Sequence, residues 1–323
     1  MIRGLYTSAS GMFALQQRQE ALANNLANIN TPGFKQDVGV MRAFPEQLIS
    51  RIRDQEGPDV QGMPLMGGQA AVIGRLNAGV YMSEAITMFQ QGDIMETRNP
   101  YDVALMDNLQ PDDEGNERRL FFSVAQIDPD ELDQPAPQDQ IRYTRNGNWN
   151  VNADGYLVTP EGYYVLDNQN QAIRVNDPVA QVNVGERLQI NELGELMYED
   201  PDTGVLTAMN NQRLGLAVVT NPSQLVREGV GLYRWEGAGQ PVAIDVAEAE
   251  DQAALAAGEY DESRIAGRYG TKQGWIERAN VDAAQTMTDM MSVLRAYEAN
   301  QRVLTTIDTT LDKAANDVGR VNG

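Results

Sequence analysis

Residues 5–29 of the chain read LYTSASGMFALQQRQEALANNLANI, and this stretch decides the fold. Two series of positions with a seven-residue spacing interleave along it: Leu5, Met12, Gln19, Leu26 and Ser8, Leu15, Leu22, Ile29. Six of these eight residues are apolar, which is the pattern of a helix that packs along a narrow seam against another helix. No proline interrupts the pattern before Thr31-Pro32-Gly33, so it predicts one helix from about Gly4 to Asn30.

The other end of the chain carries the same spacing. Its two series are Met290, Tyr297, Leu304, Leu311, Val318 and Val293, Asn300, Ile307, Ala314, Val321. Only Asn300 is polar, and a polar residue at such a position often fixes the register of an assembly. Because a seven-residue seam is narrower than the apolar face of a globular core helix, we expect partner helices from other copies of the chain. Packing of the two terminal helices on each other within one chain is the alternative.

The predicted assembly interface takes its residues from both seams. It consists of Leu5, Met12, Leu15, Leu22, Leu26, Ile29, Met290, Val293, Tyr297, Asn300, Leu304, Ile307, Leu311 and Val318.

Composition limits the classes of function. The 323 residues include no Cys and no His, which excludes disulfides, Ser-His and Cys-His catalysis and the commonest metal ligands. No apolar run approaches the roughly 20 residues of a membrane helix, and the N-terminus predicts no cleaved signal peptide. Residues 54–269 carry a net charge of −23, more than the −21 of the whole chain, because the two ends together carry +2. The middle is therefore expected to be solvated. No basic cluster predicts nucleic-acid binding.

The middle of the chain has short β-type runs with turn residues between them. Among these, Asn152-Ala153-Asp154-Gly155 predicts a tight hairpin, and Leu214 to Thr220 predicts a buried strand. The fold class expected is α+β: a discontinuous helical coiled-coil domain formed by both ends, and a central β-rich domain.

The predicted domain boundaries follow these composition changes. The helical domain takes residues 1–35 and 272–323, the β-rich domain takes 81–246, and an acidic insert with a return linker takes 247–271. Residues 36–80 are expected to be a linker, with a turn and short helix over 36–53 and a loop over 54–77. The sequence leaves open whether 247–267 is a surface helix or a flexible insert.

Two features resemble functional sites. Asn150, Asn152, Asp154, Gly155 and Glu161 match the spacing of a calcium-binding loop, but the flanking sequence is of strand type, so a hairpin is the better interpretation. Acidic clusters at 112–114 and 128–131 lie in polar segments with little apolar sequence to raise a pKa, which favours solvated loops over a hydrolase site. We therefore predict no catalytic residue, no cofactor, no metal and no enzymatic activity.

Several motifs together resemble one known family. They are 5–12 (LYTSASGM) with 23–35 (ANNLANINTPGFK), 143–148 (YTRNGN) with 155–159 (GYLVT), and 273–281 (QGWIERANV) with 295–300 (RAYEAN). This pattern is similar to the flagellar basal-body rod and hook proteins, and 41–46 (MRAFPE) with 79–82 (GVYM) most resembles the distal-rod hook-basal-body proteins of Gram-positive bacteria. The signature residues are Asn24, Asn25, Asn28, Pro32, Gly33, Phe34, Glu277, Asn280, Tyr297 and Glu298.

The resemblance implies a structural subunit of the bacterial flagellar basal body. Such a subunit would be exported by the flagellar type III apparatus without a cleaved signal, would assemble with copies of itself and with other rod and hook proteins, and would transmit torque through packed helices. The alternatives are a self-associating surface adhesin and, less favoured, a carboxylate-dependent hydrolase.

Overall fold

The computed structural model describes ten stretches of the chain, which are residues 2–51, 71–76, 79–112, 114–132, 134–177, 182–183, 188–199, 205–229, 231–257 and 263–318. The chain forms two compact units. The helical unit comprises Met1–Asn24, Asp37–Ile86 and Ala284–Gly323, and the β unit comprises Asn25–Gln36 and Thr87–Ala283. This division places residues 37–86 with the terminal helices and residues 25–36 with the β structure, which the sequence-based boundaries do not anticipate. The α+β fold class is confirmed.

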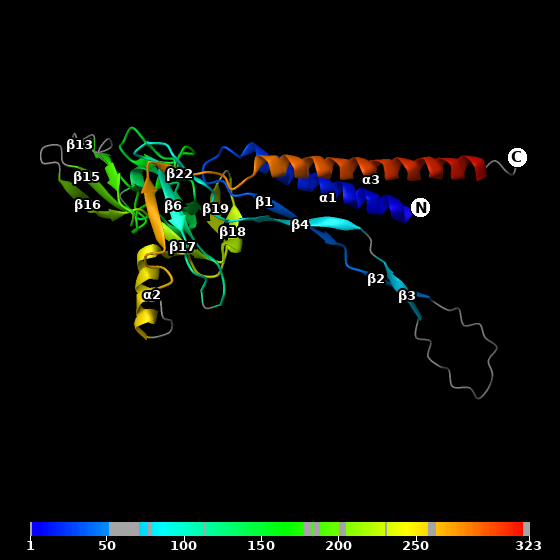
Figure 1. Ribbon diagram of the computed structural model, residues 1–323, viewed down its shortest axis with the longest axis horizontal. Coiled ribbons are helices and arrows are strands. Elements are labelled where there is room, and N and C mark those ends of the chain that lie inside the picture. The colour runs from blue at the N-terminus through cyan, green and yellow to red at the C-terminus, as the bar shows by residue number, and fades with distance from the viewer. Residues whose placement is uncertain are drawn as a thin grey trace, which may run out of the picture. The chain divides into compact units, whose positions relative to one another are not determined.

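Two helices from opposite ends of the chain pack together in the helical unit: α1 (Ile2–Ala27) and α3 (Ala283–Val318), drawn in blue and in orange to red in Figure 1. A Cβ atom added at Gly4 would lie 3.1 Å from Cδ1 of Ile307, and one added at Gly11 would lie 3.2 Å from Nδ2 of Asn300. The second contact lies further along α1 and earlier along α3, so the two helices run antiparallel. Their backbones approach closely because α1 presents glycine at these points.

Two short antiparallel ribbons complete the helical unit. Strand β1 (Asp37–Ala43) pairs with β4 (Val80–Thr87), and β2 (Gln47–Arg51) pairs with β3 (Ala71–Leu76).

The prediction of a turn and short helix over 36–53 was therefore wrong, and so was a loop over 71–76. Short apolar runs fit either periodicity, and here the pairing partner lies some distance further along the chain. The rest of the predicted loop, at 54–70 and 77, lies outside the described residues.

The β unit is built around a nine-stranded antiparallel sheet in the part of the chain that the structure describes. Strand β7 (Arg118–Ala125) is central and pairs with β8, β11 and β17. The other strands of this sheet are β8 (Ile141–Thr144), β9 (Asn150–Val151), β10 (Leu157–Val158), β11 (Tyr164–Val165), β17 (Leu216–Thr220), β18 (Leu225–Arg227), β19 (Leu232–Trp235) and β20 (Val242–Ala243).

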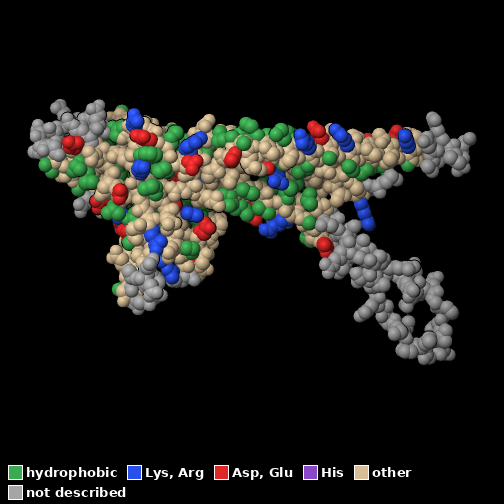
Figure 2. All heavy atoms as spheres, in the orientation of Figure 1, with side chains coloured by type: hydrophobic (Ala, Val, Ile, Leu, Met, Phe, Trp, Pro, Cys, Tyr) green, Lys and Arg blue, Asp and Glu red, His purple; other side chains and the backbone are tan. Residues whose placement is uncertain are grey.

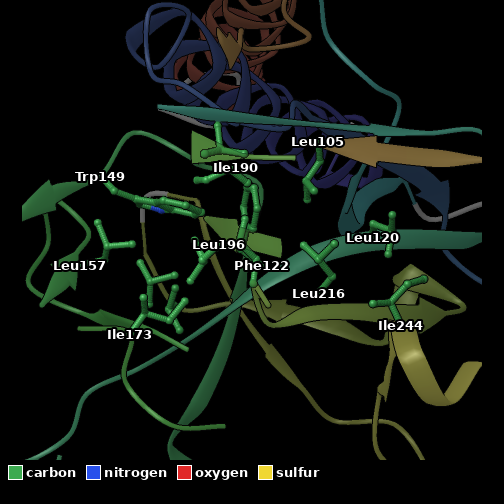
Figure 3. Packing of buried hydrophobic residues seen from close by; sticks show 14 of the residues in the cluster. Leu105, Leu120, Phe122, Trp149, Leu157, Ile173, Ile190, Leu196, Leu216 and Ile244 are labelled. Carbon is green, nitrogen blue, oxygen red and sulfur yellow. The ribbon is translucent and has the colours of Figure 1, made fainter. Parts of the chain in front are cut away.

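Both faces of this sheet are buried. Successive residues of a strand point to opposite faces, so Phe121 and Phe122 of β7 enter different clusters. Phe122 packs edge-to-face on Trp149, with ring centroids 4.7 Å apart, in the cluster drawn in Figure 3. Phe121 lies with Phe89 and Tyr233 in the second cluster. Apolar burial on both faces is the main stabilising contribution to this unit.

Smaller elements surround the sheet. The pairs are β5 (Ile94–Glu96) with β22 (Trp275–Glu277), β6 (Val103–Asp107) with β21 (Tyr269–Gln273), and β12 (Asn176–Asp177) with β13 (Val182–Asn183). Strands β14 (Leu188–Ile190), β15 (Glu195–Glu199) and β16 (Leu206–Arg213) form a separate sheet. Within the described residues, short 3-10 helices cover Pro129–Glu131, Gln138–Gln140 and Pro222–Gln224.

Two expectations about the β unit are resolved by these elements. Strands β9 and β10 pair across the turn at Asn152–Gly155, so the predicted hairpin is confirmed. The acidic segment that the sequence left open contains helix α2 (Ile244–Ala257), while residues 258–262 lie outside the described chain.

Candidate functional site

The predicted seam residues of the terminal helices are mostly half-buried within the single chain. Val293 is the exception with 3% of its surface exposed, and the side chain of Val318 lies outside the described residues. The other twelve, all half-buried, are Leu5, Met12, Leu15, Leu22, Leu26, Ile29, Met290, Tyr297, Asn300, Leu304, Ile307 and Leu311. These side chains keep apolar surface that a second partner can cover.

The most buried face of α1 is made of small residues that seam analysis did not single out. Gly11 and Ala14 are buried, as is Ser8, which has the seven-residue spacing but is not among the predicted interface residues. These three small residues are spaced by three, so they share one helix face, where small side chains allow a second helix to pack closely. This spacing in the sequence could have predicted the buried face.

Large apolar side chains lie exposed beside the seams. Tyr6 and Phe13 on α1 are 66% and 69% exposed, and Met287 and Met291 on α3 are 51% and 53% exposed. Hydrophobic side chains are visible on the surface in Figure 2. A pair of helices with this much exposed apolar surface is suited to association.

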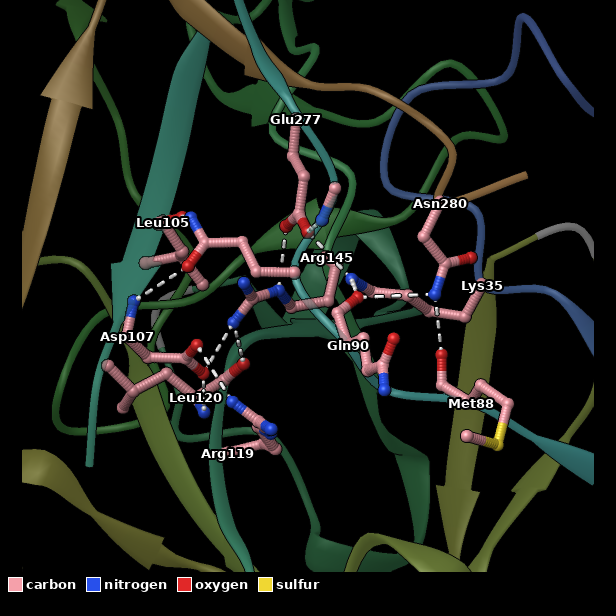
Figure 4. A network of polar contacts seen from close by, with 12 residues as sticks. Lys35, Met88, Gln90, Leu105, Asp107, Arg119, Leu120, Arg145, Glu277 and Asn280 are labelled. Carbon is pink, nitrogen blue, oxygen red and sulfur yellow. Dashed lines mark hydrogen bonds and ion pairs between the residues drawn. The ribbon is translucent and has the colours of Figure 1, made fainter. Parts of the chain in front are cut away.

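Four charged side chains form a buried cluster inside the β unit, shown in Figure 4. Nζ of Lys35 lies 2.6 Å from Oε1 of Glu277, and Nε of Arg145 lies 2.9 Å from Oε2 of the same carboxylate. Nη1 of Arg145 lies 2.9 Å from Oδ2 of Asp107. None of the four side chains is more than 2% exposed. These four side chains carry two positive and two negative charges in a site closed to water, and the partly exposed Arg119 lies at its edge, 3.6 Å from Oδ1 of Asp107.

Electrostatics in this cluster oppose the effect of burial. Burial lowers the pKa of the Lys35 ammonium to about 8, although the Glu277 carboxylate acts to raise it. Burial acts to raise the pKa of the Glu277 carboxyl, but the charges of Arg145 and Lys35 outweigh it and hold that pKa below its usual range. Glu277 is therefore ionised at neutral pH, and its two cations hold it in place.

The loop at 31–36 is held by contacts from the far end of the chain. The Gly33 amide donates to the Glu277 carbonyl at 2.8 Å, and the Gln36 amide donates to Oδ1 of Asn280 at 2.7 Å. The guanidinium of Arg227 stacks over the Phe34 ring at 4.6 Å. Signature residues from both ends of the sequence thus meet at one place.

The remaining signature residues have different environments. Asn25 is buried, Asn28 accepts a hydrogen bond from the Thr31 hydroxyl, and Glu298 is exposed on α3. Asn24 is exposed and Pro32 is half-buried. The structure brings together Gly33, Phe34, Glu277 and Asn280, and the sequence analysis missed Lys35, Asp107 and Arg145, which complete that site.

The calcium-like spacing belongs to the hairpin turn. Oδ1 of Asn152 accepts from the backbone amides of Asp154 and Tyr156, at 3.1 and 2.8 Å, so this atom stabilises the turn. Among the residues described, no group of three or more carboxylates is placed to hold a metal ion, and no helix is long and apolar enough to cross a membrane.

Comparison with known proteins identifies the family. Three family models match: Flagella basal body rod protein over residues 5–35, Flagellar hook protein FlgE/F/G D1 domain over 132–196, and Flagellar basal body rod FlgEFG protein C-terminal over 272–317. The flagellar hook-basal body complex protein FlhO of Bacillus subtilis is 33% identical over 322 residues, covering 99% of this chain and 100% of that protein. The chain belongs to the flagellar basal-body rod and hook protein family.

Further members of this rod and hook family match almost the whole chain. The flagellar basal-body rod protein FlgG of Agrobacterium fabrum is 30% identical and covers 95% of this chain and 96% of its own length. FlhP of Bacillus subtilis, a flagellar hook-basal body complex protein, is 26% identical and covers 96% of this chain and 97% of its own length. The resemblance drawn from the sequence motifs is confirmed. The two terminal models include Lys35 and Glu277, which lie in the buried cluster.

Proposed function

We propose that this member of the flagellar rod and hook family is a structural subunit of the basal-body rod, and that it polymerises through α1 and α3. The observation that supports this most is the apolar surface of these helices. Their seam residues are half-buried within one chain, and Tyr6 and Phe13 are open to solvent. Neighbouring subunits would cover these surfaces and gain about 25 cal/mol for each Å² of apolar surface removed from water.

The proposed subunit works mechanically. Helices packed side by side resist twisting because close-packed side chains have low compressibility and transmit strain. The rod would carry torque from the motor to the hook in this way. Its partners are copies of itself, other rod and hook proteins, and the flagellar type III export apparatus that delivers it without a cleaved signal peptide. No catalytic role is part of the proposal.

The rival functions receive less support. A carboxylate-dependent hydrolase would need an acid held in an apolar pocket, whereas Asp128 and Glu131 are exposed. A surface adhesin would account for exposed apolar helices, but it does not account for similarity along the whole chain to proteins named for the flagellar basal body.

Cryo-electron microscopy of isolated basal bodies tests the proposal. The source bacterium would carry the chain with an epitope inserted at Gly115, an exposed turn with open space around it. Antibody density is expected on the rod, and cells that lack the gene are expected to lack hooks. Complete hook-bearing basal bodies in cells without the gene, or label only on the cell surface, would contradict a rod subunit.

A further inference from the structure

The buried cluster in the β unit joins parts of the chain that are far apart in sequence. Lys35 belongs to the loop after α1, Asp107 ends β6, Arg145 follows β8 and Glu277 ends β22. Lys35 and Glu277 are separated by 242 positions. The cluster therefore forms only when loop 31–36 and segment 275–280 both lie against Asp107 and Arg145.

Charge balance makes loop 31–36, which carries Lys35, and segment 275–280, which carries Glu277, depend on each other. With Glu277 removed, Lys35 and Arg145 would share only Asp107, and one buried positive charge would be left over. With Lys35 removed, the two carboxylates would face Arg145 and one buried negative charge would be left over, although Arg119 lies 3.6 Å from Oδ1 of Asp107 and is 23% exposed. An uncompensated buried charge is strongly unfavourable, so each end provides the charge that the other end needs.

Main-chain hydrogen bonds also connect loop 31–36 with segment 275–280. The Gly33 amide donates to the Glu277 carbonyl, and the Asn280 amide donates to the Phe34 carbonyl at 3.3 Å. The Lys35 ammonium also donates to the Gln90 carbonyl, and Glu277 accepts from the Gly92 amide at 2.8 Å, so both side chains hold the same segment. Without either chain end, several buried donors and acceptors of the other end would lose their partners.

We propose that Lys35 and Glu277 form a two-ended latch, in which docking of loop 31–36 and docking of segment 275–280 onto the β unit depend on each other. Lys35 follows the end of α1 at Ala27 by eight residues, and Glu277 precedes the start of α3 at Ala283 by six. The latch therefore holds the chain segment that follows α1 and the segment that precedes α3 within the β unit.

Hydrogen exchange of the full-length chain tests the latch, because it reports each segment separately. Three single variants are compared with the unchanged chain: Glu277→Gln, Lys35→Met and the control Glu96→Gln, which alters an exposed carboxylate on β5, the strand paired with β22. We expect Glu277→Gln to accelerate exchange in 33–36, and Lys35→Met to accelerate exchange in 275–280, by roughly 100-fold or more. The amides of 120–124 in β7 and the control variant should keep their protection.

Effects confined to the mutated end, or a uniform loss throughout the β unit, would overturn the latch. The double variant Lys35→Met/Glu277→Gln gives a second test, because it leaves Arg145 paired with Asp107. Its exchange at both ends should be slower than that of the worse single variant, and additive effects would argue against coupling. If a single variant does not fold, recovery of a folded β unit in the double variant supports the latch, and failure of the double variant as well overturns it.

Discussion

The helical unit and the β unit differ in how far their large side chains are buried within one chain. In the helical unit, Tyr6 and Phe13 are more than 60% exposed and the seam residues are half-buried. In the β unit, Phe122 and Trp149 are completely buried, and even charged side chains such as Arg145 and Glu277 are closed off from water. Among the described residues, the β unit buries two large apolar clusters and a set of paired charges within one chain, whereas the helical unit leaves the aromatic rings of Tyr6 and Phe13 exposed.

The difference suggests that the β unit folds within one chain and that the helical unit provides the surface for assembly. A unit with a closed core can keep its structure as a monomer, because burial is already complete. Helices whose apolar faces are half open have marginal stability alone and gain stability from partners.

Leu304→Asp should abolish assembly while the β unit stays folded. Leu304 is a half-buried seam residue of α3. Burying a carboxylate in an interface costs at least several kcal/mol, against about 1.5–3 kcal/mol gained by burying a leucine. Cells with this variant should lack hooks and filaments by electron microscopy and should contain a protease-resistant fragment of the β unit. The exposed control Arg302→Glu should be milder, and normal swimming with Leu304→Asp at a normal protein level would count against the assembly surface.

Amide exchange in a dilute monomer should differ sharply between the two units. We expect the amides of residues 5–29 to exchange faster than those of β7 by at least about two orders of magnitude, because α1 depends on partners for much of its burial. In polymerised protein, the amides of α1 should be protected from exchange. Strong protection of α1 in a sample proven monomeric by ultracentrifugation would show that the pair of helices is stable on its own.

Gly33→Ala should destabilise the β unit by about 2–5 kcal/mol in chemical denaturation, from backbone strain and overpacking together. Gly33 has a φ of +68°, and a Cβ there would lie 2.5 Å from the carbonyl carbon of Arg145. Gly162 provides a matched control, since its φ is +89° and open space surrounds it. Gly162→Ala should cost only about 1–2 kcal/mol. Equal effects of the two variants would mean that the close approach at Gly33 is unimportant.

Calcium should have no effect on the hairpin at residues 150–161. Oδ1 of Asn152 is engaged by two backbone amides, and strands β9 and β10 flank the turn where a calcium loop would have helices. Calorimetric titration with micromolar calcium should give no binding heat. Binding that disappears in Glu161→Gln would show that the spacing does form a site.

The sequence by itself determined the terminal helices, the hairpin at 152–155 and the family. Each of these rests on local signals: a seven-residue repeat, an Asp-Gly turn and short motifs whose residues are adjacent in the chain. The register of the seam also follows from the sequence, since Met290, Tyr297 and Leu304 are less exposed than neighbours such as Met291 and Val303. That these residues contact other subunits stays a prediction.

The ribbons formed by 37–43 with 80–87 and by 47–51 with 71–76, and the buried cluster, follow only from the tertiary structure. The apolar residues of 40–49 have a spacing compatible with a helix, and only pairing with segments further along the chain places most of them in strands. Lys35, Asp107, Arg145 and Glu277 resemble ordinary surface charges when the sequence is inspected residue by residue. They become a balanced buried site because folding brings distant segments together, and electrostatic pairing depends on distance in space and on exclusion of water, which separation along the chain does not specify.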